Sequence, residues 1–213
     1  MTPPHVTPLR NPVGTHVKVG PGLARGTLKG ARELGLEALQ VFTGNPRGWA
    51  LSEGDPREDS AFREGCAEDG IRVVVHTGSY VAQSHEGAAA DGLRTAALRR
   101  VRDGLLPILD TIADDTMPWL LLDEEGGTTA TVDRVVEIAG PGRLRLVHAN
   151  DSKDPRGSMR DRHERLGEGH IGTGAIAELL RHPATEGVPF ILETPGSRDP
   201  GSDQIALVKT MRL

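Results

Sequence analysis

Cysteine and long apolar runs are both scarce in this sequence, and each scarcity excludes a class of protein. The 213 residues contain one cysteine, Cys66, so they can form neither an internal disulfide framework nor a cysteine-rich zinc site. No run approaches the roughly 20 apolar residues of a membrane-spanning helix, and MTPPHVTPLR lacks the apolar core of a signal peptide. We therefore expect a cytoplasmic protein with no membrane partner, in which Cys66 is an inert thiol.

An excess of positive charge is also lacking. The net charge of -5 argues against binding nucleic acid through bulk charge, so any contact with DNA must be local. Bound divalent metal ions would supply positive charge that this count leaves out, so a phosphate substrate is not excluded. A length of 213 residues without tandem repeats or low-complexity linkers predicts a single domain over residues 1–213.

Short β-branched or apolar runs alternate with helical segments along the chain. This order is typical of an α/β fold in which helices connect the strands of a parallel sheet. The expected strands are Gly14 to Val19, Glu37 to Phe42, Ile71 to His76, Trp119 to Asp123, Leu144 to His148 and Val188 to Glu193. The expected helices are Gly22 to Leu34, Ser60 to Asp69, about Gly87 to Ile112, Thr131 to Ile138, Ala175 to Arg181 and the C-terminal tail.

Histidines and carboxylates stand where several of these strands end. The carboxyl ends of parallel strands in an α/β barrel meet at one mouth, so side chains distant in sequence gather there. Imidazole and carboxylate ligands together suit zinc or manganese, and a carboxylate can bridge two ions. The candidate metal ligands are His76, Asp123, His148 and Glu193 at the strand ends, and Asp161 and His163 in the loop after the fifth strand.

Four segments of the sequence carry a resemblance to a known family. They are GTHVKVGPGL, ALQVFTGNPRGW, VHANDSKDPRGSMRDRHERLGEGHIG and VPFILETPG. At these segments the chain resembles endonuclease IV, the family of apurinic/apyrimidinic endonucleases. The resemblance implies a TIM-type (β/α) barrel and a cluster of up to three zinc ions, with manganese as an alternative ion.

The resemblance also implies roles for particular residues. His76, His148, Asp161, His163 and Glu193 fall on positions where the family binds its metal cluster, and Asp123 or Glu124 falls near the family's bridging glutamate. Arg47 falls on the arginine that enters the base stack of DNA. Tyr80 matches the family's minor-groove tyrosine if one residue is inserted after His76.

Two segments of the family have no counterpart here. Between Val101 and Trp119 no strand corresponds to the family's fourth, and between Ile138 and Leu144 there is no room for its sixth. Three of the family's nine ligands are lost with them. We therefore expect a truncated barrel of about six strands, with an open sheet edge through which the chain could self-associate.

The activity that the resemblance implies is hydrolysis, in double-stranded DNA, of the phosphodiester on the 5′ side of an abasic site. It also implies that Glu193 and Asp123 are the catalytic residues. Two alternatives stay open. One is a non-catalytic remnant that binds damaged DNA, an alternative raised by the missing segments, and the other is a metal-dependent sugar isomerase or epimerase, which shares this barrel type. Some of the residues also have a structural reading: His16 as a hydrogen-bonded strand residue, and Asp161 with His163 as part of a solvated turn.

Overall fold

The computed structural model describes residues 11–42, 54–76, 120–122, 128–142, 144–155, 158, 160, 162–195 and 201–212. The first part of the chain forms β1 (Val13–His16), the π-helix η1 (Leu23–Leu28), α1 (Lys29–Glu33), β2 (Ala38–Phe42), α2 (Pro56–Asp69) and β3 (Arg72–His76). The second part forms β4 (Leu120–Leu122), α5 (Thr128–Ala139), β5 (Leu144–Ala149), β6 (Asp151–Ser152), β7 (His163–Glu164), α6 (Gly172–Arg181), the 3-10 helix η2 (Pro183–Thr185), β8 (Phe190–Leu192) and α7 (Ser202–Met211).

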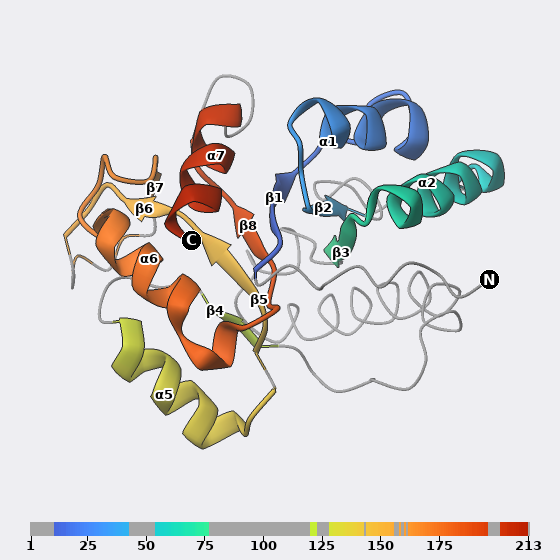
Figure 1. The fold of residues 1–213 in the computed structure, drawn as a ribbon. Helices are drawn as coiled ribbons and strands as arrows, with labels where there is room; N and C mark the ends of the chain where they lie inside the picture. Colours follow the sequence, from blue (N-terminus) through green and yellow to red (C-terminus); the bar gives the residue numbers. More distant parts are fainter. Residues whose placement is uncertain are drawn as a thin grey trace, which may run out of the picture.

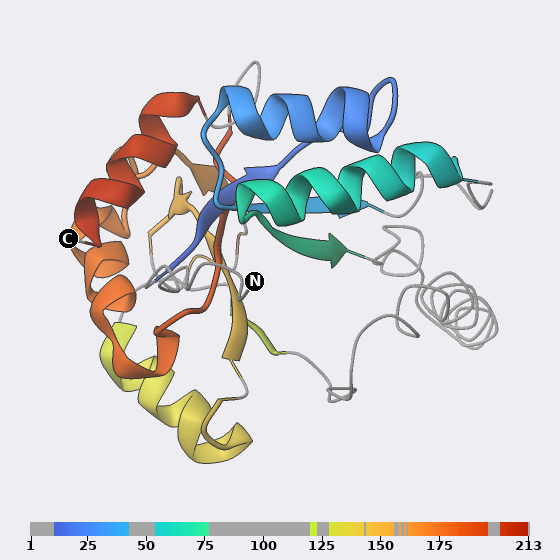
Figure 2. The same cartoon turned by 45° about the vertical axis from the view of Figure 1, so that its right-hand side comes forward.

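Six strands form one parallel sheet in the order β3-β2-β1-β8-β5-β4. The helices lie along one side of this sheet, and its opposite side is concave (Figures 1 and 2). A parallel sheet curled inside a layer of helices is a truncated TIM-type barrel, which confirms the expected fold class. Within the described residues β3 and β4 each pair with one strand, so they are the two edges of the sheet.

A single hydrogen bond shows how strongly the sheet curls. Gln40 on β2 and His148 on β5 are separated in the sheet by β1 and β8. In a flat sheet these two strands would be roughly 14 Å apart, because neighbouring strands are spaced by about 4.8 Å. Nevertheless, His148 Nε2 lies 2.8 Å from Gln40 Oε1. The two side chains therefore meet across the concave interior.

The two faces of the sheet have different compositions. On the outer face, strand residues such as Leu39, Val147 and Phe190 pack with apolar residues of every covering helix in one large core. On the inner face the buried apolar cluster consists of Ala38, Leu146 and Ile191 alone among the described residues. The outer face therefore holds the fold together, and the inner face has room for polar groups.

The six strands of the parallel sheet each lie within three residues of the expected bounds, and some of the helix starts differ by as much or more. The helix α2 begins at Pro56 rather than Ser60, because the Asp55 side chain accepts hydrogen bonds from the backbone N–H groups of Arg57 and Glu58. The helices α5 and α6 each begin three residues before the expected position. The helix expected from about residue 87 to 112 lies outside the described residues.

The segment between α5 and β5 is where the family's sixth strand was expected to be missing. After α5 ends at Ala139, a turn that includes Gly140 and Gly142 leads into β5 at Leu144. Both glycines have positive φ angles, 94° and 71°, as expected where a helix stops before a strand. No strand intervenes among these described residues, so the absence of a sixth family strand is confirmed. The region of the other expected absence, 101–119, is outside the described residues.

At the amino-terminal edge of the sheet, Glu37, which directly precedes β2, makes an ionic contact with residues at the end of α7. Arg212 donates from Nη2 to Glu37 Oε1 over 2.8 Å, Lys209 Nζ lies 3.3 Å from the same oxygen, and the Val13 N–H donates to Glu37 Oε2 over 3.1 Å. Burial raises the pKa of Glu37, but the hydrogen bonds from Arg212 and Val13 outweigh it, so the pKa is lowered from its ordinary 4.5. Glu37 therefore stabilises the fold in its ionised form.

Replacing the Glu37 carboxylate should lower the stability of the fold without changing the carboxyl edge of the sheet. We expect Glu37→Gln to lower the free energy of unfolding by about 1 to 2 kcal/mol, because charged hydrogen bonds are replaced by neutral ones. Because the folded pKa is below the unfolded one, the difference should be complete above about pH 5 and shrink as the pH falls below 4. Urea unfolding at several pH values measures both effects, and a difference that grew in acid would contradict this account.

Candidate functional site

The register of the sheet brings several of the predicted site residues to its carboxyl edge. His76 is the last residue of β3 and is the Cα partner of Phe42, the last residue of β2. His148 is the penultimate residue of β5, and Glu193 directly follows β8. The Glu193 N–H donates to Ala149 O over 3.2 Å, which holds the ends of these two strands together. The edge is therefore shared by residues from distant parts of the sequence.

The other predicted residues lie outside the described part of the chain. These are Asp123, Asp161, Arg47 and Tyr80, together with the side chain of His76. Among the described residues, no three His, Cys, Asp or Glu side chains form a group that could hold a metal ion. The geometry of the site therefore rests on His148, Glu193 and His163.

His148 and Glu193 face each other on the inner side of the sheet. His148 Nδ1 lies 3.4 Å from Glu193 Oε2, and 4% of the histidine side chain and 26% of the glutamate side chain are exposed. On its other side, His148 Nε2 donates to Gln40 Oε1, because an amide oxygen can only accept. In the neutral imidazole, Nδ1 then carries a lone pair. A lone pair and a carboxylate oxygen at this distance repel each other unless a proton or a metal cation lies between them.

His163 reaches the same edge from the hairpin of β6 and β7. Its Nδ1 lies 2.7 Å from the backbone oxygen of Glu193. A carbonyl oxygen only accepts, so Nδ1 carries the proton and Nε2 of the neutral ring carries the lone pair. A backbone carbonyl that fixes the tautomer of a histidine is a common support for a metal ligand. The structure therefore ties His163 to the strand end that carries Glu193.

Asp151 organises the loop between the hairpin and α6, and the sequence analysis did not single it out. Its fully buried carboxylate accepts hydrogen bonds from the N–H groups of Ser152, Gly167, Ile171 and Gly172. Burial raises the pKa of Asp151, but these hydrogen bonds outweigh it and lower the pKa from its ordinary 3.8. A β-carbon at Gly169 would lie 2.5 Å from this carboxylate, so the loop needs glycine there.

The basic side chains of the hairpin are engaged with acidic ones. Arg162 donates from Nε and Nη2 to the two carboxylate oxygens of Asp154, each over 2.6 Å. Lys153 Nζ lies 3.7 Å from Glu164 Oε2, and Arg160 Nη1 lies 3.9 Å from Asp154 Oδ1. These pairs fix the shape of the hairpin on which His163 stands.

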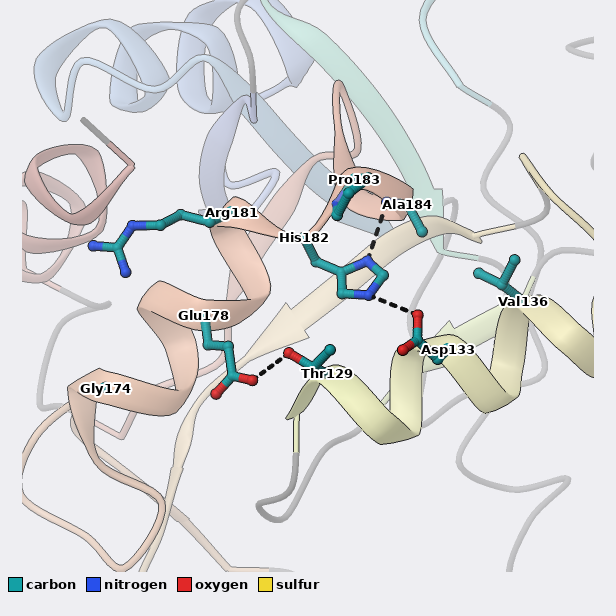
Figure 3. Close-up of a pocket in the computed structure, with 9 residues that line it drawn as sticks. All are labelled: Thr129, Asp133, Val136, Gly174, Glu178, Arg181, His182, Pro183 and Ala184. Atoms are coloured by element: carbon teal, nitrogen blue, oxygen red, sulfur yellow. Dashed lines mark hydrogen bonds and ion pairs between the residues drawn. The ribbon is translucent and has the colours of Figure 1, made fainter.

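His182 with Asp133, and Cys66, have structural roles in the fold. A hollow of about 780 Å³ between α5 and α6 is lined by His182 and Asp133, whose Nε2 and Oδ1 atoms are 3.1 Å apart (Figure 3). His182 Nδ1 accepts from the Ala184 N–H over 3.1 Å, so this ring connects η2 to α5 in the helix layer. Burial raises the pKa of the Cys66 thiol to about 11, which agrees with an inert cysteine.

Comparison with known proteins identifies the family. Two proteins named probable endonuclease 4, from Streptomyces coelicolor and Streptomyces avermitilis, are each 36% identical to this chain. The matches cover 95% of this chain and 96% of the first protein, and 98% of this chain and 93% of the second. The chain belongs to the endonuclease 4 family. A family described as xylose isomerase-like TIM barrel also matches residues 115–212.

The endonuclease 4 relatives are longer within the matched region. The match to the Streptomyces coelicolor protein runs over 281 residues, more than the 213 of this chain, so that protein has internal segments without a counterpart here. Among solved structures, endonuclease IV from Thermus thermophilus superposes with a TM-score of 0.70, at 23% identity, over 94% of this chain and 98% of the other. The structure described as AsfvAP:AG superposes with a TM-score of 0.55 at 16% identity, over 94% and 97%. These two likenesses support the barrel fold.

None of the described helices is both long enough and apolar enough to cross a membrane.

Proposed function

We propose that this chain is a DNA-repair endonuclease that uses bound zinc to hydrolyse the phosphodiester 5′ to an abasic site in double-stranded DNA. Its membership of the endonuclease 4 family supports this proposal, and so do the names of its relatives. The observation that carries it is the pair formed by His148 Nδ1 and Glu193 Oε2, which face each other at the carboxyl edge of the sheet.

The separation of these two atoms fits zinc. A tetrahedral zinc ion with bonds of about 2.0 to 2.1 Å to nitrogen and oxygen holds its donor atoms about 3.4 Å apart. His148 Nδ1 and Glu193 Oε2 are 3.4 Å apart. One imidazole and one carboxylate are also donor types that zinc and manganese accept. We propose these two residues as ligands of one ion.

The remaining ligands are proposed from position and resemblance. His76 ends the edge strand β3, and Asp123 directly follows β4 in sequence. Asp161 lies two residues before His163, whose Nε2 carries the lone pair in the arrangement described above. We propose Arg47 and Tyr80 as contacts to the DNA around the abasic site, because local contacts must replace the bulk positive charge that the chain lacks.

The contribution of the chain's own residues would be to hold negatively charged carboxylates where they bind the metal and orient the attacking water. Zinc, when bound, lowers the pKa of a coordinated water and neutralises charge on the phosphate. The Glu193 carboxylate, held at the strand end by its own backbone contacts to Ala149 and His163, would hold the metal and orient the attacking water. Asp123 would share that role.

The missing family segments predict that the activity is weak. Zinc is held firmly by about four donors, and each lost ligand loosens the ion. We therefore expect fewer bound ions than in the longer relatives and a need for added metal.

The test is incubation of the purified chain with a duplex that contains one abasic site, with and without added zinc or manganese. We expect slow incision 5′ to the abasic site that requires metal and stops with a chelator, and no incision of an intact duplex. Binding of the duplex without incision at any metal concentration would overturn the proposal in favour of a non-catalytic remnant. Turnover of a sugar with one manganese ion would overturn it in favour of an isomerase.

A further inference from the structure

The inner face of the sheet contains a polar side chain whose place is unusual. Gln40 is 1% exposed; it shares this face with the apolar Ala38, Leu146 and Ile191, and its Cα partner on the neighbouring strand β1 is His16. Burying an amide among apolar side chains costs free energy unless the amide is hydrogen bonded. The described partner of Gln40 Oε1 is His148 Nε2, at 2.8 Å. The role of the buried Gln40 amide therefore concerns His148.

The contact selects one of two forms of the imidazole. A neutral histidine carries its proton on either Nδ1 or Nε2, and the hydrogen bond made by one nitrogen decides which. With the amide oxygen of Gln40 turned toward the ring, as in the structure, the contact holds the proton on Nε2, because this oxygen only accepts. The lone pair is then on Nδ1, the nitrogen that lies 3.4 Å from Glu193 Oε2. Without Gln40, the carboxylate would instead attract a proton to Nδ1, on the side where a metal would bind.

We propose that Gln40 is a positioning residue that keeps the Nδ1 lone pair of His148 directed at Glu193 and at the ion between them. This inference rests on the metal site proposed above, and it adds a residue from β2 to a site built from β5 and β8. Histidine ligands in metal sites are commonly supported in this way by an acceptor on the second nitrogen. Gln40 reaches His148 because the sheet curls, so the curvature itself supports the site.

The test compares the parent chain with Gln40→Leu, which removes the acceptor and preserves an apolar fit. Gln204→Leu is the matched control, because Gln204 is 5% exposed and its Oε1 accepts from the Leu166 N–H over 2.8 Å, away from His148. Nitrogen-15 NMR of labelled histidine in metal-free protein at pH 8.5 reports the protonated nitrogen, with His148→Asn used to assign the signal. Zinc affinity is then measured by competition with a chelating dye.

We expect the His148 proton on Nε2 in the parent and in Gln204→Leu, and on Nδ1 in Gln40→Leu. Zinc affinity should fall about 10- to 100-fold in Gln40→Leu and at most a few-fold in the control. A proton on Nδ1 in the folded parent would overturn the inference, even if Gln40→Leu failed to fold. An unchanged tautomer or unchanged zinc affinity in a folded Gln40→Leu would overturn it too. Neither readout needs nuclease activity. Absence of incision would therefore contradict the proposed function and leave this inference unaffected.

Discussion

Glu193→Gln should abolish most of the metal-dependent incision, with a fall of about 100-fold or more. The change keeps the size of the side chain but removes the negative charge that faces His148 Nδ1 at 3.4 Å. Charge stabilisation by a bound metal is worth several kcal/mol in such reactions, and each 1.36 kcal/mol is about a factor of ten in rate. Single-turnover cleavage of the abasic-site duplex at saturating metal measures the effect.

A matched substitution separates this effect from a general loss of charge. Glu178 is an exposed residue on α6 that contacts Thr129 of α5, in the helix layer. Glu178→Gln should keep the parent's incision rate, because it lies away from the carboxyl edge of the sheet. Incision by Glu193→Gln at the parent's rate would contradict the proposed role of Glu193 in holding the metal and orienting the attacking water.

Asp151→Asn should cause a large loss of stability, about 3 kcal/mol in the free energy of unfolding. The buried carboxylate accepts from four backbone N–H groups, and an amide would turn a donor toward some of them. Hydrogen bonds to a buried charge are worth about 1.5 to 3 kcal/mol each, and unpaired buried donors add a further cost. Urea unfolding followed by circular dichroism measures the change.

The same variant has a pH signature. The pKa of Asp151 in the folded chain is below its ordinary value of 3.8, so its stabilising effect is complete above that value and disappears as the pH falls further. The difference between parent and Asp151→Asn should therefore shrink below about pH 4. Asp69→Asn, at the end of α2 where Asp69 pairs with the exposed Arg32, serves as the control and should change the unfolding midpoint little. Equal effects of the two substitutions would contradict the role assigned to Asp151.

The sheet could be predicted from the sequence because its strands are marked by apolar runs that end in polar residues. The run Val73 to Val75 and the run Leu120 to Leu122 each lie inside a strand of the structure. Parallel strands buried under helices need such runs, so the pattern and the structure have the same cause. His148 and Glu193 could be predicted to share one edge for the same reason, whereas His163, on the short strand β7, was expected there only as part of the loop after the fifth strand.

The supporting residues could not be predicted in this way. Gln40 stands in the middle of a strand, and only the curvature of the sheet brings it to His148 on a strand three places away. Asp151 meets the N–H groups of residues 167–172 because the intervening chain folds back as the hairpin of β6 and β7, each only two residues long. Strands this short leave no periodic pattern, and the glycines at 167, 169 and 172 are the one local sign of a tight loop in this part of the sequence.

The expected self-association through an open sheet edge stays a prediction. Within the described residues β3 and β4 are the sheet edges, and an unpaired parallel strand offers backbone N–H and C=O groups to another chain. The metal site that we propose at the carboxyl edge does not depend on it, because His148 lies on β5 and Glu193 directly follows β8, and neither strand is at an edge of the sheet.

A crystal of the chain soaked in zinc, with anomalous scattering recorded at the zinc absorption edge, would test whether two side chains from separate strands hold one cation. The expected result is a peak within bonding distance, about 2 Å, of both His148 Nδ1 and Glu193 Oε2. A map with zinc bound elsewhere, or with a direct hydrogen bond closing the space between these two atoms at saturating zinc, would contradict the account.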